Sequence, residues 1–268
     1  MSGKCTGPSA VITAALLFSS CNIGNISGTP VPTPSMSLPT PQFAASCGDT
    51  LDTSANFAGT WKLGCTVALE DSNGNPISWW FDNLVISGST FTESVGIAND
   101  SACDTAGTQG TMVVTGTYAI GSASSLGGAA DINFTVSSVK ITPGSSSQAT
   151  TWNTSVYTST SGSTTGFCGI TTWTSGTATD VTGKVDGNSG CDYPVAGTVL
   201  NQVFALGNYG GSLMTCNTPI NAVIFGTSQT TGYGQASVAS LHPGAVLSSD
   251  PTAGAYPSGW EAAIFSGP

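Results

Sequence analysis

The feature that most restricts the fold of this chain is the alternation of short strand-forming runs with turn-forming clusters from Phe57 onward. The runs are rich in Val, Ile, Thr, Phe and Tyr, and the clusters between them consist mainly of Gly, Ser, Asn and Asp. β-Branched and aromatic residues favour strands, whereas the small polar residues favour turns. No stretch combines a helical apolar period with good helix formers, so the pattern predicts an all-β domain.

The expected strands follow one another closely up to residue 225. The stretch Thr227–Pro268 is rich in Gly, Ser and Pro, and it is expected to form loops with at most one edge strand. In chain order, the expected strands are Gly59–Leu69, Ile77–Ser87, Thr90–Ile97, Gly110–Ile120, Ala130–Thr142, Trp152–Thr158, Ile170–Trp173, Val181–Val185, Thr198–Leu206, Leu213–Cys216 and Val223–Phe225.

The amino terminus has the pattern of an export signal. Lys4 precedes a short apolar run from Ala10 to Phe18, which is too short to span a membrane. The ending Leu17-Phe18-Ser19-Ser20-Cys21 resembles a bacterial lipobox, in which the cysteine becomes the lipidated first residue. We therefore expect a signal peptide over residues 1–20, lipidation at Cys21, a Pro/Ser/Thr-rich tether over 21–46 and one domain over 47–268.

The cysteine count agrees with export. The chain has 8 cysteines and none forms a C-x-x-C motif, so zinc ribbons and thioredoxin-like redox sites are not expected. Cys5 leaves with the signal and Cys21 takes the lipid, which leaves an even number for disulfides in an oxidising compartment. Spacing alone does not determine the pairing. We expect bridges between neighbouring segments at Cys65–Cys103 and Cys168–Cys191, and a third, Cys47–Cys216, that ties the start of the domain to its later part.

The scarcity of charge excludes several classes of protein. Only 7% of the residues are charged, the net charge is −10, and the 4 basic residues are all lysines. A nucleic-acid binder needs several cations to neutralise phosphates, so a nucleic-acid partner is not expected. The chain has 1 histidine, which excludes a multi-histidine metal centre, and no metal or cofactor is expected.

An ordered set of short motifs resembles a family of small bacterial lipocalin-like lipoproteins. Asn56-Phe57-Ala58-Gly59-Thr60-Trp61 looks like the first strand of such barrels, in which Gly-x-Trp places the indole across one barrel end. The motifs that follow are Cys65, Ser87 to Thr92, Asn99-Asp100 with Cys103, Gly116 to Gly121, Asp131 to Thr135, Phe167-Cys168-Gly169, Trp173 and Asp180 to Gly183. The arginine that this family carries near its last strand has no counterpart, and Leu241-His242-Pro243 stands near its expected place.

The resemblance implies an antiparallel up-and-down barrel, lipocalin-like and stapled by disulfides. A β-sandwich is the alternative that the strand pattern leaves open. An up-and-down barrel can hold one small ligand in its mouth, so a small apolar or amphipathic ligand is the expected partner. The aromatics expected to line that site are Trp79, Phe81, Phe91, Tyr118 and Phe134, although the sequence does not say which of them point inward.

Catalysis is not expected. His242 lies in a loop-like stretch before Pro243, and no Gly-x-Ser-x-Gly elbow accompanies it. The acids that could form a carboxylate pair stand in no recognisable active-site motif. These acids are Glu70, Asp71, Asp82, Glu93 and Glu261.

Two functions therefore remain from sequence. The first is an exported, lipid-anchored barrel at the outer membrane or cell surface that binds a small ligand without catalysis. The alternative is a structural or adhesive surface protein that assembles into filaments through strand contacts, because few charges oppose side-by-side association.

Overall fold

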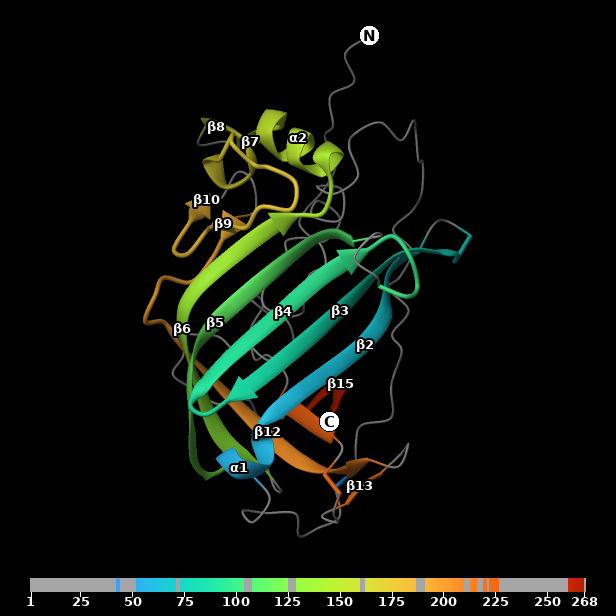
Figure 1. Ribbon diagram of the computed structural model, residues 1–268, viewed down its shortest axis with the longest axis vertical. Coiled ribbons are helices and arrows are strands. Elements are labelled where there is room, and N and C mark those ends of the chain that lie inside the picture. The colour runs from blue at the N-terminus through green and yellow to red at the C-terminus, as the bar shows by residue number, and fades with distance from the viewer. Residues whose placement is uncertain are drawn as a thin grey trace.

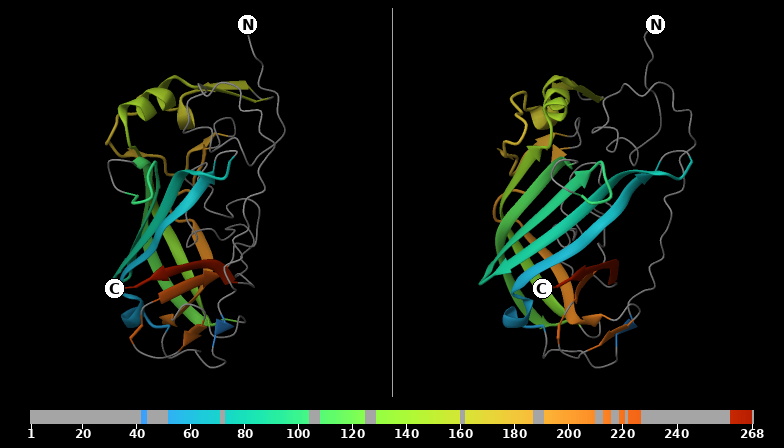
Figure 2. Two further views of the ribbon diagram at one scale, coloured as in Figure 1. Left: turned by 90° about the vertical axis from the view of Figure 1, so that its right-hand side faces the viewer. Right: turned by 45° about the vertical axis from the view of Figure 1, so that its right-hand side comes forward.

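The computed structural model describes residues 42–43, 52–70, 73–103, 108–124, 129–159, 162–186, 191–209, 213–215, 219–220, 222–226 and 260–267 (Figure 1). Long tilted strands form the body of the molecule. An insertion containing helix α2 lies at one end of these strands, and the one-turn helix α1 lies at the other end (Figures 1 and 2).

Eight of the described strands make up the wall of a nearly closed antiparallel barrel. Their hydrogen-bonded order is β2-β3-β4-β5-β6-β12-β14-β15, and β15 returns to β2 through the pair Ser266↔Lys62. At this seam the Ser266 hydroxyl donates a hydrogen bond of 3.0 Å to the carbonyl of Lys62. The strands of the wall are β2 (Gly59–Glu70), β3 (Pro76–Ser87), β4 (Thr90–Ala98), β5 (Thr108–Ala123), β6 (Ala130–Pro143), β12 (Val199–Tyr209), β14 (Ala222–Gly226) and β15 (Trp260–Ser266).

The barrel predicted from sequence is thus confirmed, and the sandwich alternative is not adopted. Strands β2 to β6 follow the chain as a simple meander, with sequential antiparallel pairing. One expectation for the C-terminal part was wrong. β15 is not an edge strand, because it pairs with both β14 and β2 and so closes the wall.

The edge of β6 is covered along most of its length by two different segments. Its first half pairs with β12, from Ala130↔Phe204 to Thr135↔Val199. Its far end pairs with the short strand β9 (Thr179–Asp180). This coverage satisfies backbone groups that would otherwise be open to pairing with another chain.

The segment between β6 and β12 departs from the expected pattern. Helix α2 (Ser146–Thr154) takes up the first part of the expected strand Trp152–Thr158, and β7 (Val156–Ser159) begins only afterwards. The helix forms because the Ser145 side chain caps it by accepting from the Gln148 backbone N–H at 3.1 Å. One face, with Ala149 and Trp152, is buried. Packing of that face compensates for a Ser/Thr-rich sequence of weak helix propensity.

Two further expected strands of this insertion are wrong. Ile170–Trp173 follows the short helical turn η2 (Phe167–Gly169) and is irregular, because the Asn153 side chain bonds both the Trp173 N–H (2.6 Å) and the Trp173 carbonyl (2.9 Å). Val181–Val185 spans the turn between β9 and β10. The remaining short strands are β8 (Gly162–Thr165), which pairs with β7, and β10 (Val185–Asp186), which pairs with β11 (Cys191–Asp192).

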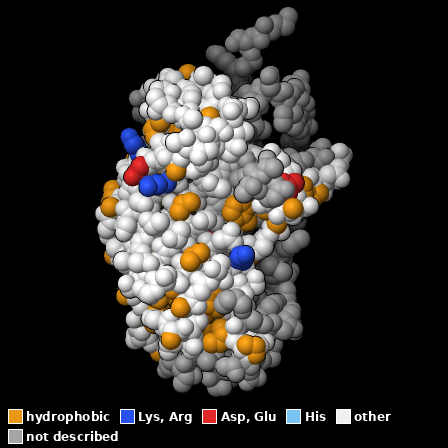
Figure 3. All heavy atoms as spheres, viewed as in Figure 1, with side chains coloured by type: hydrophobic (Ala, Val, Ile, Leu, Met, Phe, Trp, Pro, Cys, Tyr) orange, Lys and Arg blue, Asp and Glu red, His pale blue; other side chains and the backbone are white. Residues whose placement is uncertain are grey.

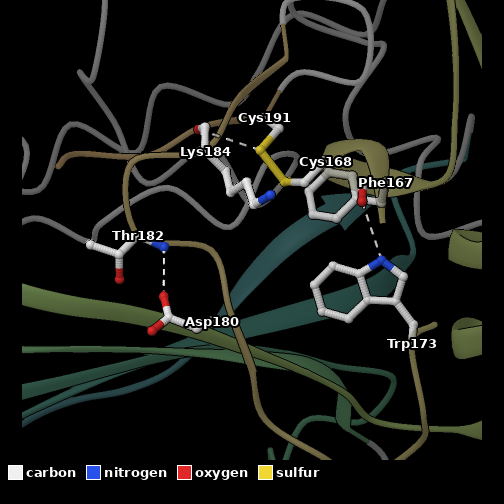
Figure 4. The surroundings of a disulfide bond; sticks show 7 residues. All are labelled: Phe167, Cys168, Trp173, Asp180, Thr182, Lys184 and Cys191. Carbon is white, nitrogen blue, oxygen red and sulfur yellow. Dashed lines mark hydrogen bonds between the residues drawn. A yellow bond between two sulfur atoms is a disulfide. The ribbon is translucent and has the colours of Figure 1, made fainter. Parts of the chain in front are cut away.

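The insertion has an aromatic core of its own beside a disulfide. The Trp152 ring lies 5.2 Å from the Phe167 ring and 4.9 Å from the Trp173 ring, measured between centroids. The Trp173 indole N–H donates to the Phe167 carbonyl at 3.2 Å, next to the Cys168–Cys191 bridge (Figure 4). Since a long Ser/Thr-rich segment buries little apolar surface, the bridge and the ring cluster together hold it on the barrel.

Two of the three expected disulfides are present among the described residues. Cys65–Cys103 joins β2 to the turn after β4, and Cys168–Cys191 joins η2 to β11. The third expected pair, Cys47–Cys216, lies outside the described residues and stays a prediction. The parallel pairing of β1 (Gln42–Phe43) with β13 (Leu213–Thr215) brings the chain before Cys47 beside the chain before Cys216.

Gly116 is a position where the barrel tolerates no side chain. A Cβ atom there would collide with the backbone carbonyl of Thr135 and with the Phe91 ring. We predict that Gly116→Ala lowers the free energy of unfolding by about 1–3 kcal/mol, because a main-chain oxygen cannot move aside as a side chain can. Urea unfolding followed by circular dichroism measures the change.

Gly64→Ala is the matched control, since nothing lies within 4 Å of a Cβ at Gly64 in strand β2 of the same wall. We expect that variant to stay within about 0.5 kcal/mol of the wild type. Equal losses in the two variants would contradict the close approach of β5 and β6 at Gly116.

Candidate ligand-binding interior

Three of the five aromatics predicted to line a ligand site do point into the barrel. Phe91, Tyr118 and Phe134 are buried, and the Phe134 ring lies beside both of the others, with centroids 5.0 Å apart for Phe91–Phe134 and 6.4 Å apart for Tyr118–Phe134. The Tyr118 hydroxyl donates to the Gly88 carbonyl at 3.0 Å in the β3–β4 turn. These rings are part of the packed core.

Helix α1 (Ser54–Phe57) completes this aromatic cluster at one end of the barrel. The Phe57 ring stands edge-on to Tyr118 at 5.5 Å and lies 4.8 Å from the Phe204 ring. The Trp61 indole N–H donates to the Phe57 carbonyl at 2.8 Å, and both side chains are buried. We refer to the six buried rings as the aromatic plug: Phe57, Trp61, Phe91, Tyr118, Phe134 and Phe204.

The other two predicted aromatics lie on the opposite face of the sheet. Trp79 and Phe81 alternate along β3 with the buried Asp82 and Leu84, so their side chains point to the outside and are half-buried. Phe81 covers Gly96 on the adjacent strand, where any Cβ would meet its ring. The five residues therefore do not form one site, because period-two alternation separates Trp79 and Phe81 from the other three.

Two carboxyl groups that the sequence analysis weighed only as catalytic acids face the interior. Asp82 on β3 and Glu93 on β4 are both 0% exposed. Moving away from the aromatic plug, the facing pairs across these strands are Ile86↔Phe91, then Leu84↔Glu93, then Asp82↔Val95. The two acids are therefore diagonal neighbours on one inner face, at a separation of about 7–8 Å typical of such positions.

The immediate surroundings of the two acids on this face are aliphatic. On β5, Val114 faces Glu93 and Met112 faces Val95. Val95 in turn faces Asp82 on its other side. Leu84, Val95, Val114 and Met112 are all buried. The acids thus interrupt an apolar wall directly beyond the plug.

Two further buried polar side chains belong to the same interior. Ser78 lies beyond Asp82 on the inward side of β3, is 3% exposed, and its hydroxyl has no hydrogen-bond partner among the described residues. Gln202 on β12 is 0% exposed and points to the same side of the strand as Phe204, two residues further along. Its Oε1 accepts a hydrogen bond of 2.9 Å from the Val203 N–H. We call Ser78, Asp82, Glu93 and Gln202 the interior polar set.

A sequence signal for the interior polar set was present but ambiguous. The run Ile77 to Ile86 carries apolar residues on both faces of β3, so alternation could not tell which face was inside. The structure resolves this ambiguity. The remaining candidates, namely Cys21, Cys47, Asp71, Cys216, His242 and the side chains of Glu70 and Glu261, lie outside the described part.

The described lysines all lie on the outside, where Asp180 is also exposed and Asp131 is half-buried. Lys62, Lys140 and Lys184 are exposed, whereas Asp82 and Glu93 face inward. The outer face in Figure 3 carries few charges among neutral polar atoms. Outside the barrel, the pKa of Asp180 is lowered, mainly by a hydrogen bond from the Thr182 side chain. A hydrogen bond of 2.8 Å from the Thr182 backbone N–H (Figure 4) and the charge of Lys140 lower this pKa further.

No protein-family model matches the chain, and no curated protein matches it either. The likeness to lipocalin-like lipoproteins therefore stays a resemblance, carried by its motifs and by the barrel. In the part of the chain that the structure describes, every helix is too short or too polar to cross a membrane.

The two aromatic groups should differ sharply in their effect on stability. We predict that Phe134→Ala costs about 3–5 kcal/mol of unfolding free energy, because it removes a fully buried ring of the plug. Phe81→Ala removes a half-buried ring from the outer face and should cost less than half as much. Thermal and urea unfolding of the two variants make the comparison. A larger loss for Phe81→Ala would reverse our assignment of the inner face.

Proposed function

We propose that this chain is an exported, lipid-anchored barrel that binds a small amphipathic ligand in its interior, without catalysis. The observation that carries the proposal is the interior polar set, which stands among buried aliphatic and aromatic side chains of the described strands. Ligand sites are typically apolar with a few placed polar groups that fix orientation, and an eight-stranded barrel is wide enough for one small ligand.

The energetic argument is that packing alone does not favour acids at these positions. Removing a carboxylate from water costs several kcal/mol, whereas Leu or Val in the same place adds to the core. Residues that break the local rule for a buried strand face are expected where function requires them. Binding is preferred over catalysis because the described residues that face the two acids from β3, β4 and β5 are aliphatic, and a catalytic site would need a nucleophile or oxyanion donors there.

The filament alternative stays a prediction. The described β1 pairs in parallel with β13 of its own chain. The same edge in an assembly would instead have to take up a strand from a neighbouring copy.

The proposed anchor is tested at Cys21. We expect Cys21→Ala to release the exported protein from the membrane fraction, because a lipidated cysteine holds the chain there through the tether. Mass spectrometry of the wild-type N-terminal peptide should show a lipid on Cys21, and Cys5→Ala is the control that leaves membrane association unchanged. Unchanged association of Cys21→Ala would exclude the anchor.

Ligand binding is tested with the neutral fluorescent probe N-phenyl-1-naphthylamine. We expect saturable binding at one site per chain, with a rise in emission as the probe enters the apolar interior. Val114→Phe, which places a larger side chain in the interior beside Glu93, should lower the affinity for the probe by about tenfold, a change of about 1.4 kcal/mol in binding free energy.

Val113→Phe is the matched control, because Val113 is the neighbouring residue of β5 on the outer face. It should leave the affinity unchanged, and circular dichroism confirms that both variants fold. Absence of saturable binding to the wild type, or equal loss in the two variants, would contradict an interior site.

A further inference from the structure

The two interior acids, Asp82 and Glu93, indicate which charge a ligand in the barrel would carry. Asp82 and Glu93 come from adjacent strands and stand on the same inner face, directly beyond the aromatic plug. A ligand that rests its apolar part on the plug or on the aliphatic wall therefore passes both carboxyl groups. Such groups accept hydrogen bonds and attract cations, whereas they repel carboxylates and phosphates.

A second, independent observation comes from Ser78. Its hydroxyl is 3% exposed, lies on the inward series of β3 beyond Asp82, and has no hydrogen-bond partner among the described residues. Buried hydroxyl groups in folded proteins are nearly always hydrogen-bonded. A polar ligand group in the interior would supply the missing partner, in line with the acids on the same strand face.

The location of the described lysines points in the same direction. The lysines at positions 62, 140 and 184 are exposed, so the described cations are on the outside while these two acids are inside. The net charge of the whole chain is −10, which further favours the approach of a cation.

We infer that the interior takes an amphipathic ligand with a protonated amine, held beside Asp82 and Glu93 with its hydrocarbon part on the apolar wall. An ammonium group has three donors and no acceptor, which suits the carboxyl oxygens of Asp82 and Glu93. The inference rests on the proposed ligand-binding function and adds the chemical class of the ligand.

The test is displacement of N-phenyl-1-naphthylamine by three compounds with the same chain length: decylamine, decanol and decanoate. We expect decylamine to displace the probe at about one tenth of the decanol concentration, and decanoate to be the weakest. The preference should persist at about 0.5 M salt, since a buried charge pair is screened much less than a surface charge.

The deciding variant is Asp82→Asn/Glu93→Gln, which keeps shape and removes the interior charge. It should bring decylamine and decanol to within about twofold of each other while the neutral probe still binds. Asp131→Asn/Asp180→Asn removes the same formal charge at positions that are not buried, and it should keep the preference. The single variants Asp82→Asn and Glu93→Gln replace the double variant if it does not fold.

The outcomes separate the two proposals. If the probe does not bind the wild type, both the binding function and the inference fail. If the probe binds but decylamine has no advantage over decanol, or keeps its advantage in the interior variants, the inference alone fails. An advantage that disappears at high salt or in the outer-face variant also overturns it, because it would come from surface charge.

Discussion

The hydrogen bond from the Trp61 indole to the Phe57 carbonyl is the contact on which the rest of the barrel depends. It fixes helix α1 across one barrel end and sets the Phe57 ring against Tyr118 and Phe204, which come from β5 and β12. The same indole ring lies against Gly267, immediately after the closing strand β15. One end of the barrel is thereby packed with aromatic rings, and Asp82 and Glu93 lie beyond these rings along β3 and β4.

Neutral interactions replace the ion pairs that this chain can hardly form. With 7% charged residues, cohesion has to come from strand pairing, aromatic contacts and disulfides. The insertion illustrates this, since Trp152, Phe167 and Trp173 pack beside the Cys168–Cys191 bridge, and burial raises the pKa of the Tyr193 phenol in the same region. A carboxyl group inside such a molecule is therefore conspicuous.

Prediction from sequence succeeded where local pattern and local contact coincide. Strands β2 to β6 carry clear runs bounded by turn residues, and the two observed disulfides join segments that are neighbours in the chain. It failed for α2, where one serine cap and one buried tryptophan outweigh poor helix propensity. It also failed for β15, whose role in closure depends on pairing with β2, about two hundred residues away, and no local signal reports such a pairing.

Prediction from sequence was also only partly successful for the candidate site. Phe91, Tyr118 and Phe134 were predicted to be near a ligand, and the structure places them in the plug. Asp82 and Glu93 were considered only as catalytic acids. For Asp82 the inner side was ambiguous, because β3 is apolar on both faces. Knowledge of the register turns these two residues from scattered acids into neighbours within one interior.

The most direct test of the account is a crystal structure of the protein with a bromine-labelled alkylamine, located by anomalous scattering. We expect the bromine inside the barrel and the amine nitrogen within about 3 Å of a carboxyl oxygen of Asp82 or Glu93. A bromine on the outer face near Trp79 and Phe81, with the interior filled by the protein's own side chains, would contradict the central claim.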